Sequence, residues 1–334
     1  MIIDVHGHVT PPSELYAYQA SLLAARGAHG RGGVKVSDDR IRESHQSPLP
    51  HFGGLSHIEH LAQGGIDRQL ISSRPYTLMH SEEPARIVEW FNEETNNIIH
   101  QTCQVFPDVF IPVAGLNQAA STSPEQWVGE LKRCVNELGF KGALLNPDPM
   151  EGAATPPGMG DRYWYPVYEA LCELDVPALV HSASCRPPAR ESYSLHFITE
   201  ETIGIIHLLN SDVMKDFPTL KLVFAHGGGA IPYQVGRFLS FRAMHDGESF
   251  LDNLRKLYFD TCLYTKDSLE LLFKVVGVDN CLFGSEKPGT GSQKDPASGR
   301  WFDDIRPLIE EIDWLTEGER SAIFEGNTTK LFRL

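Results

Sequence analysis

Eight short apolar runs, each followed by a segment with helical periodicity, place the strongest constraint on how this 334-residue chain folds. The runs lie near positions 2–5, 69–73, 110–115, 141–145, 178–180, 222–225, 258–261 and 281–284. Strands that alternate with helices pair in parallel, because each helix returns the chain to the same end of the sheet. Eight such units predict a (β/α)8 TIM barrel over residues 1–334. An open doubly wound sheet is the competing architecture, but no glycine-rich phosphate loop follows the first strand.

The segment of residues 9–56 interrupts this alternation after the first strand. It is rich in Pro, Gly, His and charged residues, and it shows helical periodicity only near residues 12–25. Connections of this length inside a compact domain are usually lids or binding loops. We therefore expect a long loop insertion that closes over the functional site.

The net charge of −15 argues against whole classes of partner. Nucleic acids and anionic membrane surfaces both require basic patches, so neither is expected to bind. No apolar run reaches the length of a membrane span, and the amino terminus lacks the basic region of a signal peptide. The six cysteines are scattered without a CxxC motif, which is typical of a reduced protein of the cytoplasm.

The first predicted strand ends in the motif His6-Gly7-His8. Residues two apart on a strand share a face, so both imidazoles point to one place at the carboxyl end of the strand. Two nitrogen ligands on a rigid element are what a catalytic metal site needs. An isolated motif of this kind is more often a pair of surface or capping histidines, and the rest of the chain decides between the two interpretations.

Polar residues follow the other predicted strands at the same end, where a barrel carries its chemistry. They are Arg74, Asn146, His181, His226, Asp260 and Glu286. Three imidazoles and one carboxylate suit Zn²⁺, with Mn²⁺, Fe²⁺ or Co²⁺ as alternatives. The expected metal ligands are His6, His8, His181 and Glu286. Because three glycines follow His226, we expect this imidazole to stand free as an acid/base group, with capping or orientation of a neighbour as the alternative.

Cations also follow several of the predicted strands. In so acidic a protein, cations gathered at one rim favour a substrate that carries carboxylates. The candidates are Arg74, Arg186, Arg190 and Lys287, and further candidates for substrate contact are Asn146, Tyr193 and His196. A solvated loop position is an equal alternative for Arg186 and Arg190, and a packing role is nearly as well founded for Tyr193 and His196. Asp260 is expected either to orient a neighbour or to serve the fold.

Four segments together resemble the amidohydrolase superfamily. They are Asp-Val-His-Gly-His at 4–8, the strand-end His181, Phe-Ala-His-Gly-Gly-Gly at 224–229 and Phe-Gly-Ser-Glu at 283–286. The likeness is closest to the decarboxylase/hydratase branch that includes aminocarboxymuconate-semialdehyde decarboxylase, and the ending at 325–332 also resembles that branch. The resemblance covers the whole chain, and it implies a metal-dependent barrel that associates into a homo-oligomer.

Glu286 departs from the pattern of the branch, most of which carries Asp at this point. The pair Ser285-Glu286 resembles the 4-oxalomesaconate hydratases and the metal-dependent C–C hydrolases that act on meta-cleavage products in lignin breakdown. Residues 146–149, 161–166 and 295–296 resemble the same two groups. By this likeness Glu286 is either a fourth metal ligand or a base beside the metal.

The first expectation for function is a Zn²⁺-dependent hydrolase that cleaves a C–C bond of a 2-hydroxy-6-oxo-dienoate bearing carboxylate groups, with water activated by the metal. His226 or Glu286 would move protons, and Arg74 would hold a carboxylate. One alternative is a hydratase that adds water to a C=C bond of a small tricarboxylate such as 4-oxalomesaconate. A non-oxidative decarboxylase and a metal-binding barrel without catalysis are the remaining alternatives.

Overall fold

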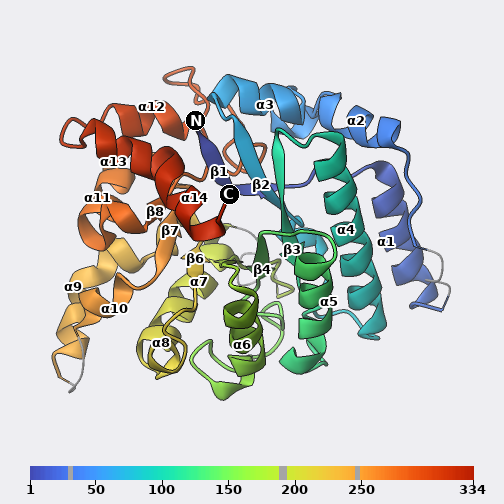
Figure 1. The fold of residues 1–334 in the computed structure, drawn as a ribbon, viewed down its shortest axis with the longest axis horizontal. Helices are drawn as coiled ribbons and strands as arrows, with labels where there is room; N and C mark the ends of the chain where they lie inside the picture. Colours follow the sequence, from blue (N-terminus) through green and yellow to red (C-terminus); the bar gives the residue numbers. More distant parts are fainter. Residues whose placement is uncertain (29–32, 188–193, 245–248) are drawn as a thin grey trace.

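The computed structural model describes residues 1–28, 33–187, 194–244 and 249–334. Within them, eight parallel strands form one sheet in chain order. The strands are β1 (Ile3–His8), β2 (Arg68–Ser72), β3 (Phe110–Gly115), β4 (Gly142–Leu145), β5 (Ala178–Val180), β6 (Leu222–Phe224), β7 (Tyr258–Asp260) and β8 (Cys281–Leu282). Hydrogen bonds of 2.8 Å from Val5 N to Phe283 O and from Glu286 N to His6 O join the two ends of this sheet. The predicted (β/α)8 barrel is confirmed (Figure 1).

Helices surround the barrel, and the last of them in the chain packs against the apolar side chains inside the barrel (Figure 1). They are α1 (Ser13–Ala25), α2 (Asp38–Gln46), α3 (His57–Gly64), α4 (Arg86–Val105), α5 (Pro124–Asn136), α6 (Tyr165–Leu174), α7 (Ser194–Leu209), α8 (Val213–Asp216), α9 (Ile231–Arg242), α10 (Phe250–Leu254), α11 (Lys266–Val276), α12 (Ile305–Glu310), α13 (Glu317–Ser321) and α14 (Asn327–Phe332). A π-helical turn, Ala322–Gly326, separates α13 from α14. Among the described residues, no helix has the length and apolar character needed to cross a bilayer.

Most strand residues are buried and apolar, because both faces of the sheet are covered. Inside the barrel, Val113, Leu144, Leu179 and Val223 pack together, and Phe332 of α14 joins this inner cluster. A second and larger cluster lies between the strands and the surrounding helices. Since side chains fill the interior, the polar residues that follow the strands gather above this layer at the carboxyl ends.

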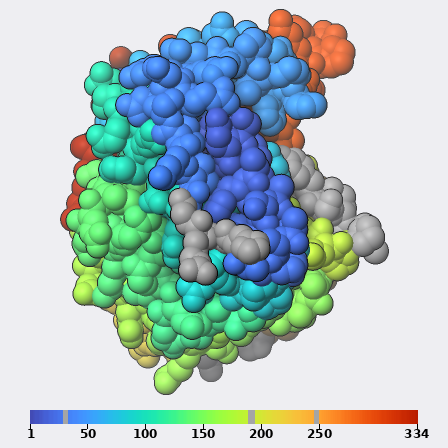
Figure 2. Space-filling model, turned by 90° about the vertical axis from the view of Figure 1, so that its right-hand side faces the viewer, coloured from blue at the N-terminus to red at the C-terminus, as the bar shows by residue number. Residues whose placement is uncertain are grey.

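Two helices lie in the segment of residues 9–56: α1 matches the helical periodicity expected near residues 12–25, whereas α2 lies where the sequence predicted an irregular loop. Both α1 and α2 pack against α4, and Figure 2 shows this blue segment spread over one side of the molecule. Ser37 caps α2 by accepting a hydrogen bond from Arg40 N, and Ile41 of the same helix is fully buried. The helix escaped prediction because its few apolar residues give a weak periodicity. The role of this segment as a lid stays a prediction.

A buried ion pair holds the loop that follows β8. Lys287 donates from Nζ to Oδ1 of Asp303, and both side chains are fully buried. Ser292 donates from Oγ to the other carboxylate oxygen of Asp303, and Lys287 Nζ lies 5.5 Å from the ring centroid of Trp301. The sequence suggested that Lys287 contacts substrate. The structure does not support this, because the ammonium group is already neutralised inside the protein.

The variant Asp303→Asn should destabilise the protein, because it removes the counter-charge of a buried ammonium group. We expect the free energy of unfolding to fall by about 3–5 kcal/mol, measured by urea denaturation. Glu311→Gln is the control, since it breaks only an exposed pair with Arg300 and should leave the transition near that of the parent protein. Equal losses in the two variants would show that the buried pair has no special importance.

Candidate metal centre and active site

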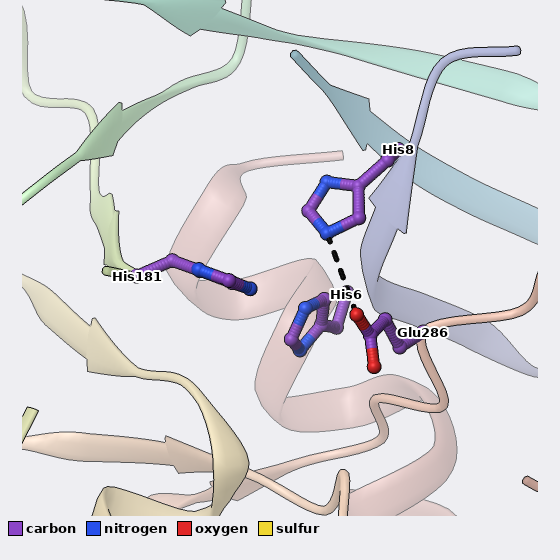
Figure 3. A group of neighbouring side chains, drawn as sticks. All are labelled: His6, His8, His181 and Glu286. Carbon is purple, nitrogen blue, oxygen red and sulfur yellow. Dashed lines mark ion pairs between the residues drawn. The ribbon is translucent and has the colours of Figure 1, made fainter. Parts of the chain in front are cut away.

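Three histidines from opposite sides of the barrel meet at the carboxyl ends of the strands. His6 and His8 end β1, whereas His181 directly follows β5. The ring centroids of His6 and His8 lie 5.2 Å apart, and the centroid of His181 lies 5.0 and 5.3 Å from them. Figure 3 shows the three imidazoles and the carboxylate of Glu286 grouped around a common centre.

A bulge in β1 turns both of its histidines towards this centre. Val5 belongs to the inner cluster of the barrel, so strict alternation would send His6 to the outer face. The pairing with β2 shifts register between Asp4 and Gly7, which reverses the alternation at that point. His6 and His8 therefore face inward together.

Each of the three imidazoles uses Nδ1 for a hydrogen bond within the protein. The partners are Asp260 Oδ2 for His6 at 2.6 Å, Ser182 O for His181 at 2.6 Å and Ser72 Oγ for His8 at 3.0 Å. The carboxylate of Asp260 and the carbonyl of Ser182 can only accept a hydrogen bond. The hydroxyl of Ser72 donates its own proton to Gly7 O at 3.2 Å, so it also accepts from the imidazole. Nδ1 is therefore the donor in all three rings, and in its neutral form each ring has a lone pair on Nε2.

The three Nε2 atoms are buried, and none has a hydrogen-bond partner within the described residues. Burial and the neighbouring imidazoles hold the pKa values of His8 and His181 well below their usual range, so both rings are neutral. Burial also lowers the pKa of His6, but the carboxylate of Asp260 outweighs it and raises the pKa overall. A carboxylate in this position makes an imidazole a better metal ligand.

Glu286 supplies the carboxylate of the group. Its backbone has a φ of 61°, a left-handed conformation that is uncommon outside glycine and frequent at functional sites. Oε1 lies 4.0 Å from Nε2 of His8, and Oε2 accepts a hydrogen bond from the hydroxyl of Tyr264 at 3.1 Å. All four ligand atoms lie within 4.8 Å of one another, and they belong to His6, His8, His181 and Glu286. Three imidazole nitrogens and one carboxylate oxygen fit a divalent metal ion such as Zn²⁺ or Mn²⁺.

His226 lies beside this group but pairs with a different carboxylate. Its ring centroid is 4.9 Å from that of His181, and its Nδ1 is 2.9 Å from Oε2 of the fully buried Glu201. Burial alone would lower the pKa of His226, but the charge and hydrogen bonds of Glu201 outweigh burial and raise it to about 10. The ring therefore holds a proton at neutral pH and is suited to donate it.

The glycines after His226 allow the backbone to pass close to neighbouring elements. Gly228 and Gly229 have φ values of 76° and 63°. A Cβ at Gly228 would lie 2.7 Å from the ring of Phe259, and one at Gly229 would lie 2.5 Å from the backbone oxygen of Ile198. Larger residues would push the chain away from α7 and from β7, and His226 would move with it.

Arg74 is a buried cation that has no acidic partner among the described residues. Its residue is 5% exposed, and its guanidinium carbon lies 5.2 Å from the ring centroid of Phe52. Nη1 donates to Pro288 O over a long 3.5 Å, and no carboxylate of the described residues forms an ion pair with it. A buried charge in this situation is suited to bind an anion. The structure thus keeps Arg74 as a candidate for holding a substrate carboxylate.

A cavity of about 210 Å³ opens beside His226 and Glu286. Its walls include the apolar side chains of Phe197, Ile198 and Leu263. The cavity therefore offers a small, largely apolar space directly next to the candidate acid/base groups and the candidate metal ligands.

Asn146 and Arg186, two predicted substrate contacts, are engaged elsewhere. The side chain of Asn146 closes its own loop, because Nδ2 donates to Asp148 O and Oδ1 accepts from Asp148 N, both at 3.0 Å. Arg186 is half-exposed and forms ion pairs with Glu82 at 2.5 Å and Glu151 at 3.3 Å. These contacts give both residues a role in loop structure, and their contact with substrate stays a prediction.

Of the three remaining candidates for substrate contact, the structure describes only His196. His196 is buried on α7, where Nε2 lies 3.7 Å from Asp148 Oδ2 and Nδ1 lies 3.8 Å from Glu200 Oε1. Tyr193 and Arg190 lie outside the described residues. His196 therefore belongs to a buried polar group around the loop after β4, and its reach to a substrate stays a prediction.

Sequence reasoning missed two residues of the site, Glu201 and Tyr264. Glu201 lies in a predicted helix, where a glutamate is ordinarily solvent-exposed, and nothing in its surroundings marks it as buried. Tyr264 lies four positions after Asp260, near the end of a predicted strand, and this place at the rim was the one available signal. Asp260 was identified, and the structure resolves its role as the partner of His6.

Comparison with known proteins gives a consistent result over the whole chain. A family model described as amidohydrolase matches residues 3–334. A 2-keto-4-carboxy-3-hexenedioate hydratase of a Sphingobium species is 37% identical, with 99% of this chain and 96% of that protein covered. A gamma-resorcylate decarboxylase of a Rhizobium species is 24% identical over 81% of this chain and 84% of the relative.

Solved structures agree with the sequence relatives. The crystal structure of a 4-oxalomesaconate hydratase from Rhodopseudomonas palustris is similar, with a TM-score of 0.88, 33% identity, and 100% of this chain and 96% of that chain covered. A dihydroxybenzoic acid decarboxylase from a Polaromonas species, solved with bound manganese and an inhibitor, has a TM-score of 0.72 at 20% identity, covering 100% and 97% of the two chains. The latter likeness shows the shared fold.

The variant His181→Ala should lose tight metal binding, because it removes one of three converging Nε2 atoms. We expect metal affinity to fall by at least ~100-fold, since even changes to residues behind the ligands cost 10–100-fold. Metal content of the purified protein and competition with a chromophoric chelator measure this. His226→Asn is the control within the site and should retain its metal. Loss of metal from both variants would move His226 into the ligand set.

Proposed function

The chain belongs to the amidohydrolase family, and from that premise we propose that it is a metal-dependent hydratase. Its reaction would add water to a carbon–carbon double bond of a small keto tricarboxylate. The Sphingobium relative and the Rhodopseudomonas structure both carry hydratase names, and each is more than 30% identical over nearly the whole chain. The name of the Sphingobium relative specifies a keto acid with three carboxyl groups and a double bond, which is the substrate class proposed here.

The observation that carries the proposal is the position of His226 and Glu286 in the lining of one cavity, with His226 bonded from Nδ1 to the buried carboxylate of Glu201. Addition of water to a double bond requires a group that takes a proton from water and a second group that gives a proton to carbon. Glu286 and His226 offer this pair. The pairing of His226 with Glu201 keeps the donor charged before the reaction.

The three imidazoles would hold the metal, and Glu286 would be its fourth ligand until the carboxylate takes up a proton from water. A divalent ion in this position supplies Lewis acidity, which makes water nucleophilic near neutral pH. We propose Zn²⁺ as the ion. Mn²⁺ is the alternative, because decarboxylases of the same fold have been solved with manganese.

Arg74, Glu286 and His226 would each perform one part of the reaction. Arg74 would hold a substrate carboxylate and orient the double bond towards Glu286. Glu286 would accept a proton from water while the hydroxyl group adds to one alkene carbon. His226 would give its proton to the other alkene carbon, and the proton gained by Glu286 replaces the one lost from His226. The sum is the addition of one water with the carbon skeleton intact.

The C–C hydrolase that the sequence first suggested is less well supported, because the Sphingobium relative and the Rhodopseudomonas structure, each above 30% identity, carry hydratase names. It remains the second candidate, since the same pair of proton-transfer groups could ketonise a dienol and assist attack on a carbonyl carbon. Decarboxylation is the third candidate. The Rhizobium decarboxylase is only 24% identical, so its likeness does not extend to the reaction.

Mass spectrometry of the products tests the proposal directly. The metal-loaded protein is incubated with 4-oxalomesaconate and, separately, with a yellow meta-cleavage product bearing carboxylates. A product heavier by one water, formed only from the tricarboxylate, supports the hydratase. Two carbon fragments from the meta-cleavage product would instead support the hydrolase, and release of carbon dioxide would support decarboxylation.

The variant His226→Asn should retain its metal but lose turnover, because asparagine cannot carry the proton that His226 holds. We expect kcat to fall by roughly 10²-fold or more, the scale of a lost general acid. Steady-state kinetics with metal content measured on the same preparation checks this. A variant with full metal and nearly normal kcat would exclude His226 as the proton donor.

The variant Arg74→Met should weaken the use of substrate, because it removes the one buried guanidinium near the site that lacks an acidic partner in the described part of the chain. We expect kcat/KM to fall by roughly 10–100-fold, the value of a lost charge-assisted hydrogen bond. Arg300→Met is the control, since Arg300 is an exposed arginine that pairs with Glu311 and is not a candidate for substrate contact. Similar losses in both variants would show that Arg74 has no specific role.

A further inference from the structure

Tyr264 follows β7 and meets the carboxylate of Glu286, which follows β8. Its hydroxyl donates to Oε2 of Glu286 at 3.1 Å. From this contact we propose that Tyr264 is a positioning residue, which orients Glu286 so that the carboxylate can bind the metal. The inference rests on the metal-dependent function proposed above and extends it to a residue that has not been assigned a role.

Because of this contact, the two carboxylate oxygens of Glu286 face different partners. Oε2 is engaged by Tyr264, while Oε1 points to the imidazoles and lies 4.0 Å from Nε2 of His8 (Figure 3). The terminal torsion of a glutamate rotates easily, so an unrestrained carboxylate would present its oxygens in many orientations. A hydrogen bond to one oxygen removes this freedom and presents the other oxygen to the metal position.

The ring of Tyr264 is itself held in place by the loop after β8. A Cβ at Gly291 would lie 2.7 Å from Cζ of Tyr264, and a Cβ at Gly289 would lie 2.8 Å from Cγ of Glu286. Two glycines therefore let this loop close on both side chains. The same loop is fastened by Ser292 and the buried Asp303, so the hydroxyl of Tyr264 has a defined position.

A packing role alone does not account for this hydroxyl. A buried tyrosine needs a hydrogen-bond partner, and within the described residues the hydroxyl has two. Cys262 Sγ is a weak partner at 3.8 Å, whereas the carboxylate of Glu286 is a strong acceptor at 3.1 Å. Tyr264 also lines the cavity beside His226, so the contact lies at the reacting side of the site.

Metal binding by Tyr264→Phe tests the inference without using the reaction. The variant removes one hydroxyl and keeps the ring. Tyr168→Phe is the matched control, because Tyr168 is another buried tyrosine whose hydroxyl donates to Met159 O at 2.7 Å, outside the site. Affinity for Zn²⁺ is measured by competition with a chromophoric chelator, and the visible spectrum of the Co²⁺-loaded protein reports the coordination of the metal.

We expect Tyr264→Phe to bind Zn²⁺ roughly 10-fold or more weakly and to show an altered Co²⁺ spectrum. Tyr168→Phe should match the parent protein in both. In a Glu286→Gln background, Tyr264→Phe should cause no further loss, because the group that it positions has been replaced. Parent-like affinity and spectrum in Tyr264→Phe would overturn the inference while leaving the proposed function intact. A parent protein that binds no metal would instead contradict the proposed function.

Discussion

Three buried imidazole nitrogens without a partner in the described protein are the constraint on which the rest of the site depends. Hydrogen bonds to Asp260, Ser72 and a backbone carbonyl fix the tautomer of each ring, so every Nε2 presents a lone pair to the same small volume. Leaving three such atoms unsatisfied would be costly for a folded protein. A divalent cation would resolve this cost, and the nearby carboxylate of Glu286 offers it a fourth ligand.

The barrel supplies the rigidity that this arrangement requires. Closure of the sheet brings the residues after β8 against β1, where Glu286 N donates to His6 O at 2.8 Å. Both His226 and Glu286 have left-handed backbones, with φ values of 50° and 61°, and the surrounding contacts hold them there. The buried pair of Lys287 and Asp303 fastens the loop that begins at Glu286. Fold stability and site geometry therefore depend on the same contacts.

The features that the sequence predicted correctly are those that show in the local order of apolar and polar residues. Apolar runs separated by helical periodicity predicted the barrel, and residues at the strand ends predicted the group of His6, His8, His181 and Glu286, because a barrel brings these ends together. The ion-pair partners of charged residues could not be predicted in the same way. Lys287 and Arg186 have the charge of substrate-binding residues, but their carboxylate partners lie 16 and 104 positions away in the chain, and only the fold brings them together. The pairing of Glu201 with His226 could not be predicted for the same reason.

Anomalous X-ray diffraction from crystals of the purified protein, recorded above and below the zinc and manganese absorption edges, tests the central claim most directly. The account predicts a single anomalous peak at bonding distance from Nε2 of all three histidines and from an oxygen of Glu286. Its edge would identify the ion. A well-ordered site without such a peak, or a peak bound to His226 in place of one of the three histidines, would contradict the account.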